Sequence, residues 1–328
     1  MAKFYEKFRN KKIKYHLLRN YSEVIDVLRN VYPKPPEEKN KHEHEHKQLW
    51  FRGSIDAGLN LIPSLYWCDE VEGDPNKLEE AQEKFLSYFQ TRRIHKLFKN
   101  QPNGHLLPRP ESTLNWLSLM EHYQATTCYL NWSLKPEVGL FFALEYLFNS
   151  QIKKPKKEFS CLWVLKPCEM NEHIWLGDKS EGRNRNELID KYIQVKSIKN
   201  TMPTFYDIEK EIREGKVDGA EKENEENNKI IRHRYQSNYP SRPINVFPQV
   251  NSDRILSQKG IFTIFPVKPR KENYYLRSLD SYPNSNLFLE CIILTDPKQI
   301  KHDLNLLGFD PYDVYPEISY RPGMVDRR

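Results

Sequence analysis

The sequence predicts one domain of the α+β class, in which helices flank a mixed or antiparallel β core. Amphipathic helical segments and short apolar strands follow one another in no regular order, whereas a parallel α/β sheet requires regular alternation. No internal repeat is visible in the sequence. The 328 residues are 38% hydrophobic and 12% aromatic, so bulky side chains are numerous enough for one substantial core.

The helices are predicted from apolar periodicity and from residues that favour helix ends. The first is expected over residues 21–32, with Ser22 as its N-cap and with prolines from Pro33 onward to stop it. Gly308 suits the left-handed position that commonly follows the end of a helix. Further helices are expected over residues 76–99, 114–123 (starting near Ser112 or Thr113), 136–148 (with Pro136 in its first turn) and 300–307.

The strands are predicted from short apolar runs that are rich in aromatic and β-branched residues. The run at residues 49–52 is expected to enter a turn at Gly53. Further strands are expected over residues 159–165, 261–267 and 287–294. Two polar stretches interrupt a domain core of about residues 20–320. They are a charged, His-rich connector at 33–47 and a charged insertion at 207–238, which is either mobile or an exposed helix with charged residues.

Charge and cysteine content favour a cytoplasmic protein with no disulfide framework. The net charge of +6 is a small difference between 51 basic and 45 acidic residues, which is typical of a solvated surface. Five cysteines without a Cys-x-x-Cys pair predict neither disulfides nor a zinc knuckle. No apolar run approaches the ~18 residues that a membrane span needs. His42 and His46 have metal-ligand spacing, but no apolar anchor fixes them, so no metal site is expected.

Arg52 is the first candidate binding residue. It lies between an apolar segment and Gly53, so its guanidinium should be partly enclosed and should need an anion or several carbonyl groups. It can bind a phosphate through two parallel hydrogen bonds, or it can form an internal ion pair with an Asp or a Glu. The residue alone does not choose between these roles.

Residues 121–133 concentrate polar and aromatic side chains. His122 lies near the end of a predicted helix, where the helix dipole favours its charged form and where it can cap the last carbonyl groups. Tyr123 and Trp132 can stack on a planar ligand or can pack in the core as ordinary aromatic residues. The other candidate residues of this segment are Glu121, Thr127 and Ser133.

Arg254 and Gln258 form the third group of candidates. Their spacing of four residues places them on a common face in a helix, and their even separation does the same in a strand. Gln258 can then hydrogen-bond a ligand hydroxyl or amide, or the two residues can close a turn before the strand at 261–267.

These segments together resemble the FRG domain family, which is named for its Phe-Arg-Gly signature, over about residues 20–320. The aromatic-Arg-Gly strand is matched at residues 50–53, and an Arg-x-x-x-Gln-x-Gly-x-Phe element is complete at residues 254–262. The matches to the central motif are His122, Tyr123, Thr127, Trp132, Pro136, Phe142 and Ala143. The matches to the terminal element are Leu307, Gly308, Tyr315 and Pro316.

The central motif departs from the family pattern at Glu121, Gln124, Thr126, Cys128 and Asn131. The family has an Arg at the position of Cys128 and an Asp at that of Asn131. Their joint absence suggests that a family ion pair has been lost as a unit.

The order of the motifs is similar to the layout of ADP-ribosyltransferases, which implies a split β-sheet and NAD as the substrate. In that layout Arg52 grips NAD, Ser133 positions the nicotinamide ribose, and Gln258 takes the place of a late catalytic Glu. Gln258 cannot carry a negative charge, so Glu121 or another acid would have to supply it. The resemblance implies Gln258, Glu121 and His122 as catalytic residues, and Arg52, Gly53, Tyr123, Thr127, Trp132, Ser133 and Arg254 as NAD-binding residues.

Three classes of function remain open. The first is an enzyme that transfers ADP-ribose from NAD to a protein acceptor or hydrolyses NAD, without a metal. Family members are often bacterial and occur in phage-defence settings, which fits a toxic or sensing role. The second is a nucleotide-sensing or interaction module without catalysis, which Gln258 favours. The third, a nucleic-acid-binding protein, is least favoured by the charge balance, and no membrane partner is expected.

Overall fold

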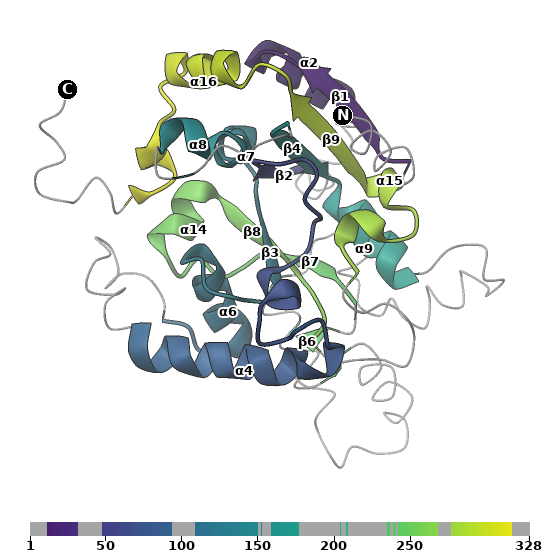
Figure 1. The fold of residues 1–328 in the computed structure, drawn as a ribbon, viewed down its shortest axis with the longest axis vertical. Coiled ribbons are helices and arrows are strands. Elements are labelled where there is room, and N and C mark those ends of the chain that lie inside the picture. Colours follow the sequence, from purple (N-terminus) through teal and green to yellow (C-terminus); the bar gives the residue numbers. More distant parts are fainter. Residues whose placement is uncertain are drawn as a thin grey trace, which may run out of the picture.

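A computed structural model describes residues 12–31, 48–93, 109–149, 152, 159–176, 204, 208, 235–236, 239–240, 242–267 and 277–316. The expected connector at 33–47 lies outside these residues, as does the expected insertion at 207–238 except for three positions. The described residues form a mixed sheet with helices packed on it (Figure 1), so the predicted α+β class is confirmed.

Seven strands form the main sheet in the order β1-β9-β4-β2-β3-β8-β7. The edge strand β1 pairs with β9 in parallel, and the other neighbours are antiparallel. In sheet order the strands span Lys14–Leu18, Leu289–Leu294, Cys161–Leu165, Trp50–Ser54, Tyr129–Ser133, Gly260–Ile264 and Ile244–Val246. The split sheet is not confirmed, because within the described residues only the short pair β5 (Tyr235–Gln236) and β6 (Tyr239–Pro240) lies outside this sheet.

The helices lie on both faces of the sheet, and Figure 1 shows α2 and α16 side by side. The longer helices are α2 (Tyr21–Val31), α4 (Leu78–Tyr88), α6 (Thr113–His122), α7 (Pro136–Ala143), α9 (Pro167–Leu176) and α16 (Pro297–Leu306). The short ones are α8 (Glu145–Phe148), α14 (Asp253–Gln258) and α15 (Ser285–Phe288). A 3₁₀ turn, η7 (Pro311–Asp313), follows α16.

Two apolar clusters cover the two faces of the sheet. Successive side chains of a strand point to opposite faces, so Trp50 belongs to one cluster and its neighbour Phe51 to the other. The larger cluster takes buried residues from α4, α6 and α9, and the smaller one takes them from α2, α7 and α16. The strands β9, β4 and β8 are therefore buried on both sides, whereas the central strand β2 is only partly buried from Arg52 to Ser54.

Gly53 is required by close packing and not by a turn, which corrects the expectation from the sequence. It lies inside β2, where an added Cβ would be 1.9 Å from the carbonyl oxygen of Gly139 and 2.3 Å from the amide nitrogen of Ala143. The backbone of α7 therefore rests directly on β2. This contact places Gly139 of α7 beside the backbone of Arg52.

Several helix boundaries differ from those predicted. The first helix begins at Tyr21 and not after Ser22, because the side chain of Asn20 accepts a hydrogen bond from the Glu23 amide at 2.9 Å. The helix expected over 76–99 is α-helical only to Tyr88, followed by a π segment over Phe89–Arg93. The helix expected over 136–148 is interrupted at Leu144, whose φ is −115° and ψ 11°.

Candidate functional site

A pocket of about 440 Å³ gathers many of the candidate residues. It lies where β2 and β3 meet the end of α6 and one side of α7. Its volume is in the range of small-molecule sites. Its lining is formed by Phe51, Arg52, Gly53, Ser54, Ile55, Ser64, Glu121, Gln124, Ala125, Thr126, Asn131, Trp132, Ser133, Val138, Gly139, Phe142, Glu145 and Gln258.

Arg52 is held in this pocket by a neutral residue. Its Nη1 donates to the backbone oxygen of Asn131 at 2.8 Å and also to the Asn131 side-chain oxygen. Among the described residues it forms no ion pair, so the expected alternative of an internal salt bridge is not seen there. Burial lowers the pKa of Arg52, while the negative charge of Glu121 opposes that shift. A guanidinium stays protonated at neutral pH and can bind an anion here.

Asn131 and Cys128, two positions that depart from the family pattern, have different surroundings in the structure. Asn131 faces Arg52, whereas Cys128 is fully buried in the larger apolar cluster and its amide donates to Gln82 at 2.8 Å. The two positions serve different environments in this protein.

Glu121 is a carboxyl group with an unusual environment. It lies near the end of α6, and its Oε2 accepts a hydrogen bond from Thr127 Oγ1 at 2.6 Å. Burial raises the pKa of Glu121 from 4.5 to about 7, although Thr127 and the charge of Arg52 both act to lower it. The pocket thus contains an acid that exchanges its proton near neutral pH, which is typical of functional sites.

His122 lies behind the pocket wall and is not one of its lining residues. Its Nδ1 is 3.1 Å from Gln258 Oε1, and its Nε2 is buried without a hydrogen-bond partner among the described residues. Burial lowers the pKa of His122 to about 3, assisted by the charge of Arg254. The sequence favoured a charged His122 at the helix end, but desolvation outweighs the helix dipole. The imidazole is therefore neutral at pH 7.

The side chain of Gln258 is held on both sides. Its Oε1 faces His122, its Nε2 donates to the carbonyl of Val314 at 3.0 Å, and its backbone oxygen accepts from Ser133 Oγ at 2.6 Å. Ser133 Oγ also accepts from the Lys135 amide at 2.9 Å. Gln258 and Ser133 both border the pocket, but these hydrogen bonds fix the wall itself.

Arg254 also lies behind the pocket. Its guanidinium is stacked between the rings of Tyr123 and Tyr315, at 4.8 and 5.0 Å from their centroids, and it donates to the His122 carbonyl at 2.7 Å. The phenol of Tyr315 donates to Oε1 of Glu145 at 2.7 Å. The terminal motif therefore closes the wall that contains Gln258 and Glu145.

The predicted site residues fall into two groups. Trp132 borders the pocket but is only 3% exposed, and its indole N–H donates to Thr263 in the core. The pocket brings together Arg52, Gly53, Glu121, Trp132, Ser133 and Gln258. The residues that lie outside its lining are His122, Tyr123, Thr127 and Arg254.

Glu145 is the main lining residue that the sequence did not identify. It directly follows the apolar run of α7, where the sequence predicts only a continuing helix. The break at Leu144 turns the chain so that Glu145 lines the pocket. The motif residue Tyr315 was the available signal, since a phenol beside core aromatic residues needs a polar partner.

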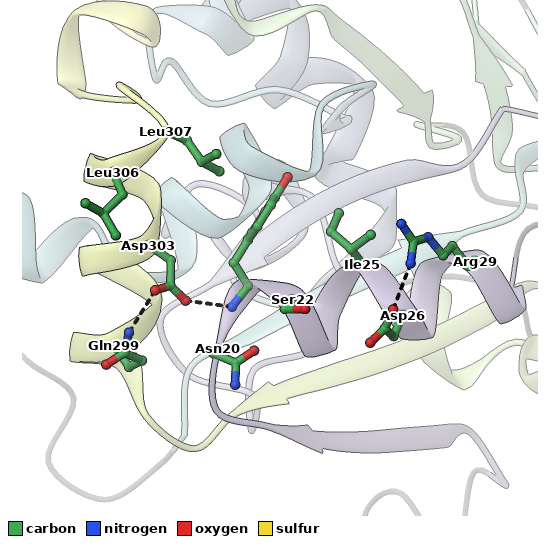
Figure 2. A pocket seen from close by; sticks show the side chains of 10 residues that line it. Asn20, Ser22, Ile25, Asp26, Arg29, Gln299, Asp303, Leu306 and Leu307 are labelled. Carbon is green, nitrogen blue, oxygen red and sulfur yellow. Dashed lines mark hydrogen bonds and ion pairs between the residues drawn. The ribbon is translucent and has the colours of Figure 1, made fainter.

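A second pocket, between α2 and α16, is larger at about 650 Å³ (Figure 2), but several of its polar groups are already paired. Asp303 accepts from the Tyr21 amide at 2.9 Å and from Gln299 Nε2 at 2.8 Å, and Asp26 pairs with Arg29 at 3.0 Å. None of the predicted catalytic or binding residues lines it. The smaller pocket is therefore the better candidate site.

The described part of the chain contains neither a metal-site cluster nor a helix suited to a membrane span. No cluster of three or more His, Cys, Asp or Glu side chains there has the geometry of a metal site. The His42–His46 segment lies outside that part. Within the same residues, no helix combines the length and the apolar character that a membrane span requires.

Comparison with known proteins gives one match. No curated protein and no solved structure matches the chain. The FRG domain family model matches residues 47–151, the part of the chain that supplies Arg52, Glu121, Ser133 and Glu145 to the pocket.

Proposed function

We propose that the pocket binds NAD and that Arg52 contacts its pyrophosphate. The observation that carries the proposal is a guanidinium that lines a pocket and whose only hydrogen-bond partner among the described residues is the neutral Asn131. Such a group offers further N–H donors in the planar geometry that suits phosphate oxygens. The hydroxyl and amide groups of the lining suit the sugar and amide groups of a dinucleotide.

In this proposal Glu121 is the acid that takes part in cleavage of NAD. Breaking the bond between nicotinamide and ribose sends the bonding electrons to the nicotinamide nitrogen and leaves a cationic ribose. A carboxylate stabilises that cation, and water or a nucleophile of a protein acceptor then bonds to the ribose carbon and loses a proton. Because the pKa of Glu121 is about 7, its carboxylate form is available at neutral and higher pH.

Gln258 is not assigned a part in bond cleavage. Its side-chain oxygen and nitrogen are engaged by His122 and Val314, and an amide carries no charge in any case. This observation favours a second candidate function, in which the same pocket senses a nucleotide without turning it over. A role in bacterial phage defence or as a toxin fits either candidate and rests on the family resemblance.

The test is calorimetric titration of NAD into the wild type and into Arg52→Ala, with nicotinamide release followed in parallel. Loss of the charge-assisted hydrogen bonds should weaken NAD binding at least about tenfold. Arg29→Ala is the matched control, because Arg29 is 75% exposed on α2 and lies outside this pocket. Equal NAD affinity in wild type and Arg52→Ala would refute the assignment of Arg52.

Nicotinamide release separates the two candidate functions. Release by the wild type that falls at least about a hundredfold in Glu121→Gln supports the enzyme. Binding without release, across a panel of protein acceptors and with water alone, supports the sensor. No NAD binding by the wild type would refute both.

A further inference from the structure

Two carboxyl groups line the pocket, and each has one oxygen fixed by a hydroxyl group. Thr127 donates to Oε2 of Glu121, and Tyr315 donates to Oε1 of Glu145. The second oxygen of Glu145, Oε2, has no hydrogen-bond partner in the described part of the chain. Glu145 thus lines the pocket with one oxygen held by Tyr315 and a second oxygen that can still accept a hydrogen bond.

Tyr315 is itself firmly placed. Its ring contacts Phe141 and Phe142 edge-on, at 5.9 and 6.3 Å between centroids, and the Arg254 guanidinium covers it at 5.0 Å. Its amide donates to the Pro311 carbonyl at 2.9 Å. A phenol held by this many contacts orients the carboxylate that it binds.

A carboxylate oxygen is only an acceptor, so the group that meets Glu145 must carry a donor. Phosphate oxygens are excluded there by charge repulsion and belong at Arg52. In a nucleotide the ribose is bonded directly to the phosphate. The donors nearest to a phosphate at Arg52 are therefore ribose hydroxyl groups.

We infer that Glu145 recognises a ribose hydroxyl group of the bound nucleotide, and that Tyr315 is a positioning residue that fixes Glu145 for this task. The inference rests on the proposed nucleotide pocket and adds its specificity: ribonucleotides bind, and analogues lacking that hydroxyl bind poorly. It also assigns a residue that neither the motif pattern nor the family resemblance identified as part of the site.

The experiment measures the affinity of the wild type for NAD, for four analogues that each lack the 2′- or the 3′-hydroxyl of one of the two riboses, and for nicotinic acid adenine dinucleotide. The wild type should bind one analogue at least about tenfold more weakly than NAD. In Glu145→Ala the ratio between NAD and that analogue should fall to about one.

Tyr315→Phe tests the positioning role, because it keeps the ring stacked on Arg254 and removes the hydroxyl group that donates to Glu145. The ratio of its affinities for NAD and for the weakly bound analogue should lie between the ratios of the wild type and of Glu145→Ala. Tyr312→Phe is the matched control, since Tyr312 is 45% exposed in the same segment and lies outside the pocket. Circular dichroism shows whether each variant is folded. If Glu145→Ala is unfolded, Tyr315→Phe provides the test.

The outcomes separate this inference from the proposed function. NAD binding without discrimination in the wild type, or equal discrimination in Glu145→Ala, overturns the role of Glu145 and leaves the NAD pocket standing. Discrimination only against nicotinic acid adenine dinucleotide, which lacks the amide donor, also overturns it. Absence of NAD binding in the wild type overturns both proposals together.

Discussion

His122 and Gln258 are 136 residues apart in the chain, and they meet inside the protein with 3.1 Å between His122 Nδ1 and Gln258 Oε1. An amide oxygen can only accept, so Nδ1 carries the proton, and a neutral ring then leaves Nε2 unprotonated. Nε2 packs against Gly260, where an added Cβ would lie 2.5 Å from it. The pair joins α6 to α14 and explains why both motifs surround one wall.

Restoring an acid at position 258 should destabilise the protein. In Gln258→Glu the carboxylate can still accept from His122, but it can no longer donate to the buried carbonyl of Val314. Leaving that acceptor unpaired and facing a negative charge should lower the free energy of unfolding by about 1–3 kcal/mol. Urea denaturation at pH 7 measures this. Gln48→Glu, at an exposed position, should match the wild type; equal stability of both variants would contradict the structural role of Gln258.

The raised pKa of Glu121 predicts a pH-dependent stability. The folded state holds the Glu121 proton more tightly than the unfolded state does. The protonated group therefore stabilises the fold below pH 4.5, and this stabilisation is lost as pH rises through about 7. Glu121→Gln removes the titration while keeping an acceptor for Thr127. Its free energy of unfolding should exceed that of the wild type by on the order of 2 kcal/mol at pH 8, and the gap should close by pH 5. A gap that does not change with pH would show that Glu121 titrates normally.

Gly53→Ala should destabilise the protein by steric overlap. The new methyl group would lie 1.9 Å from the carbonyl oxygen of Gly139, so α7 would have to move off β2. A cost of about 3 kcal/mol in the free energy of unfolding is expected from urea denaturation. Gly73→Asn is the control, because Gly73 has a left-handed φ of 76° that Asn tolerates, with no atom near its Cβ position. Similar losses in both variants would mean that packing against α7 is not the reason for Gly53.

Local signals in the sequence predicted the fold where they act within a few residues. Ser112 does accept from the Asn115 amide at 3.2 Å, and Gly308 does end α16 with a φ of 74°. The edge strand β1 gave no such signal, because Tyr15 and Leu17 remain 39% and 50% exposed and its pairing partner begins at Leu289. The periodicity of a short segment carries no information about which distant strand it pairs with.

In the candidate site too, local signals predicted some features and long-range packing decided others. Arg52 and Glu121 were identified from their motifs, and both line the pocket. His122 was expected at the ligand, yet the packing of β8 against α6 buries it, and that contact depends on Gly260 far along the chain. Glu145 was missed because its exposure to the pocket depends on the break in the helix at Leu144. Side-chain types are readable from sequence, whereas which side of a wall they occupy depends on tertiary packing.

Arg254 should contribute to stability through its planar guanidinium. It stacks between Tyr123 and Tyr315 and donates to the His122 carbonyl at the end of α6, so Arg254→Met loses both the cation–π contacts and a charged donor. The free energy of unfolding should fall by about 2 kcal/mol, and Arg254→Lys should recover only part of it, because an ammonium cannot stack in the same way. Urea denaturation measures both. Arg29→Met, which removes only an exposed ion pair, should cost less than about 0.5 kcal/mol. If Arg254→Lys were as stable as the wild type, charge alone and not the stacked geometry would hold α6 and the terminal segment together.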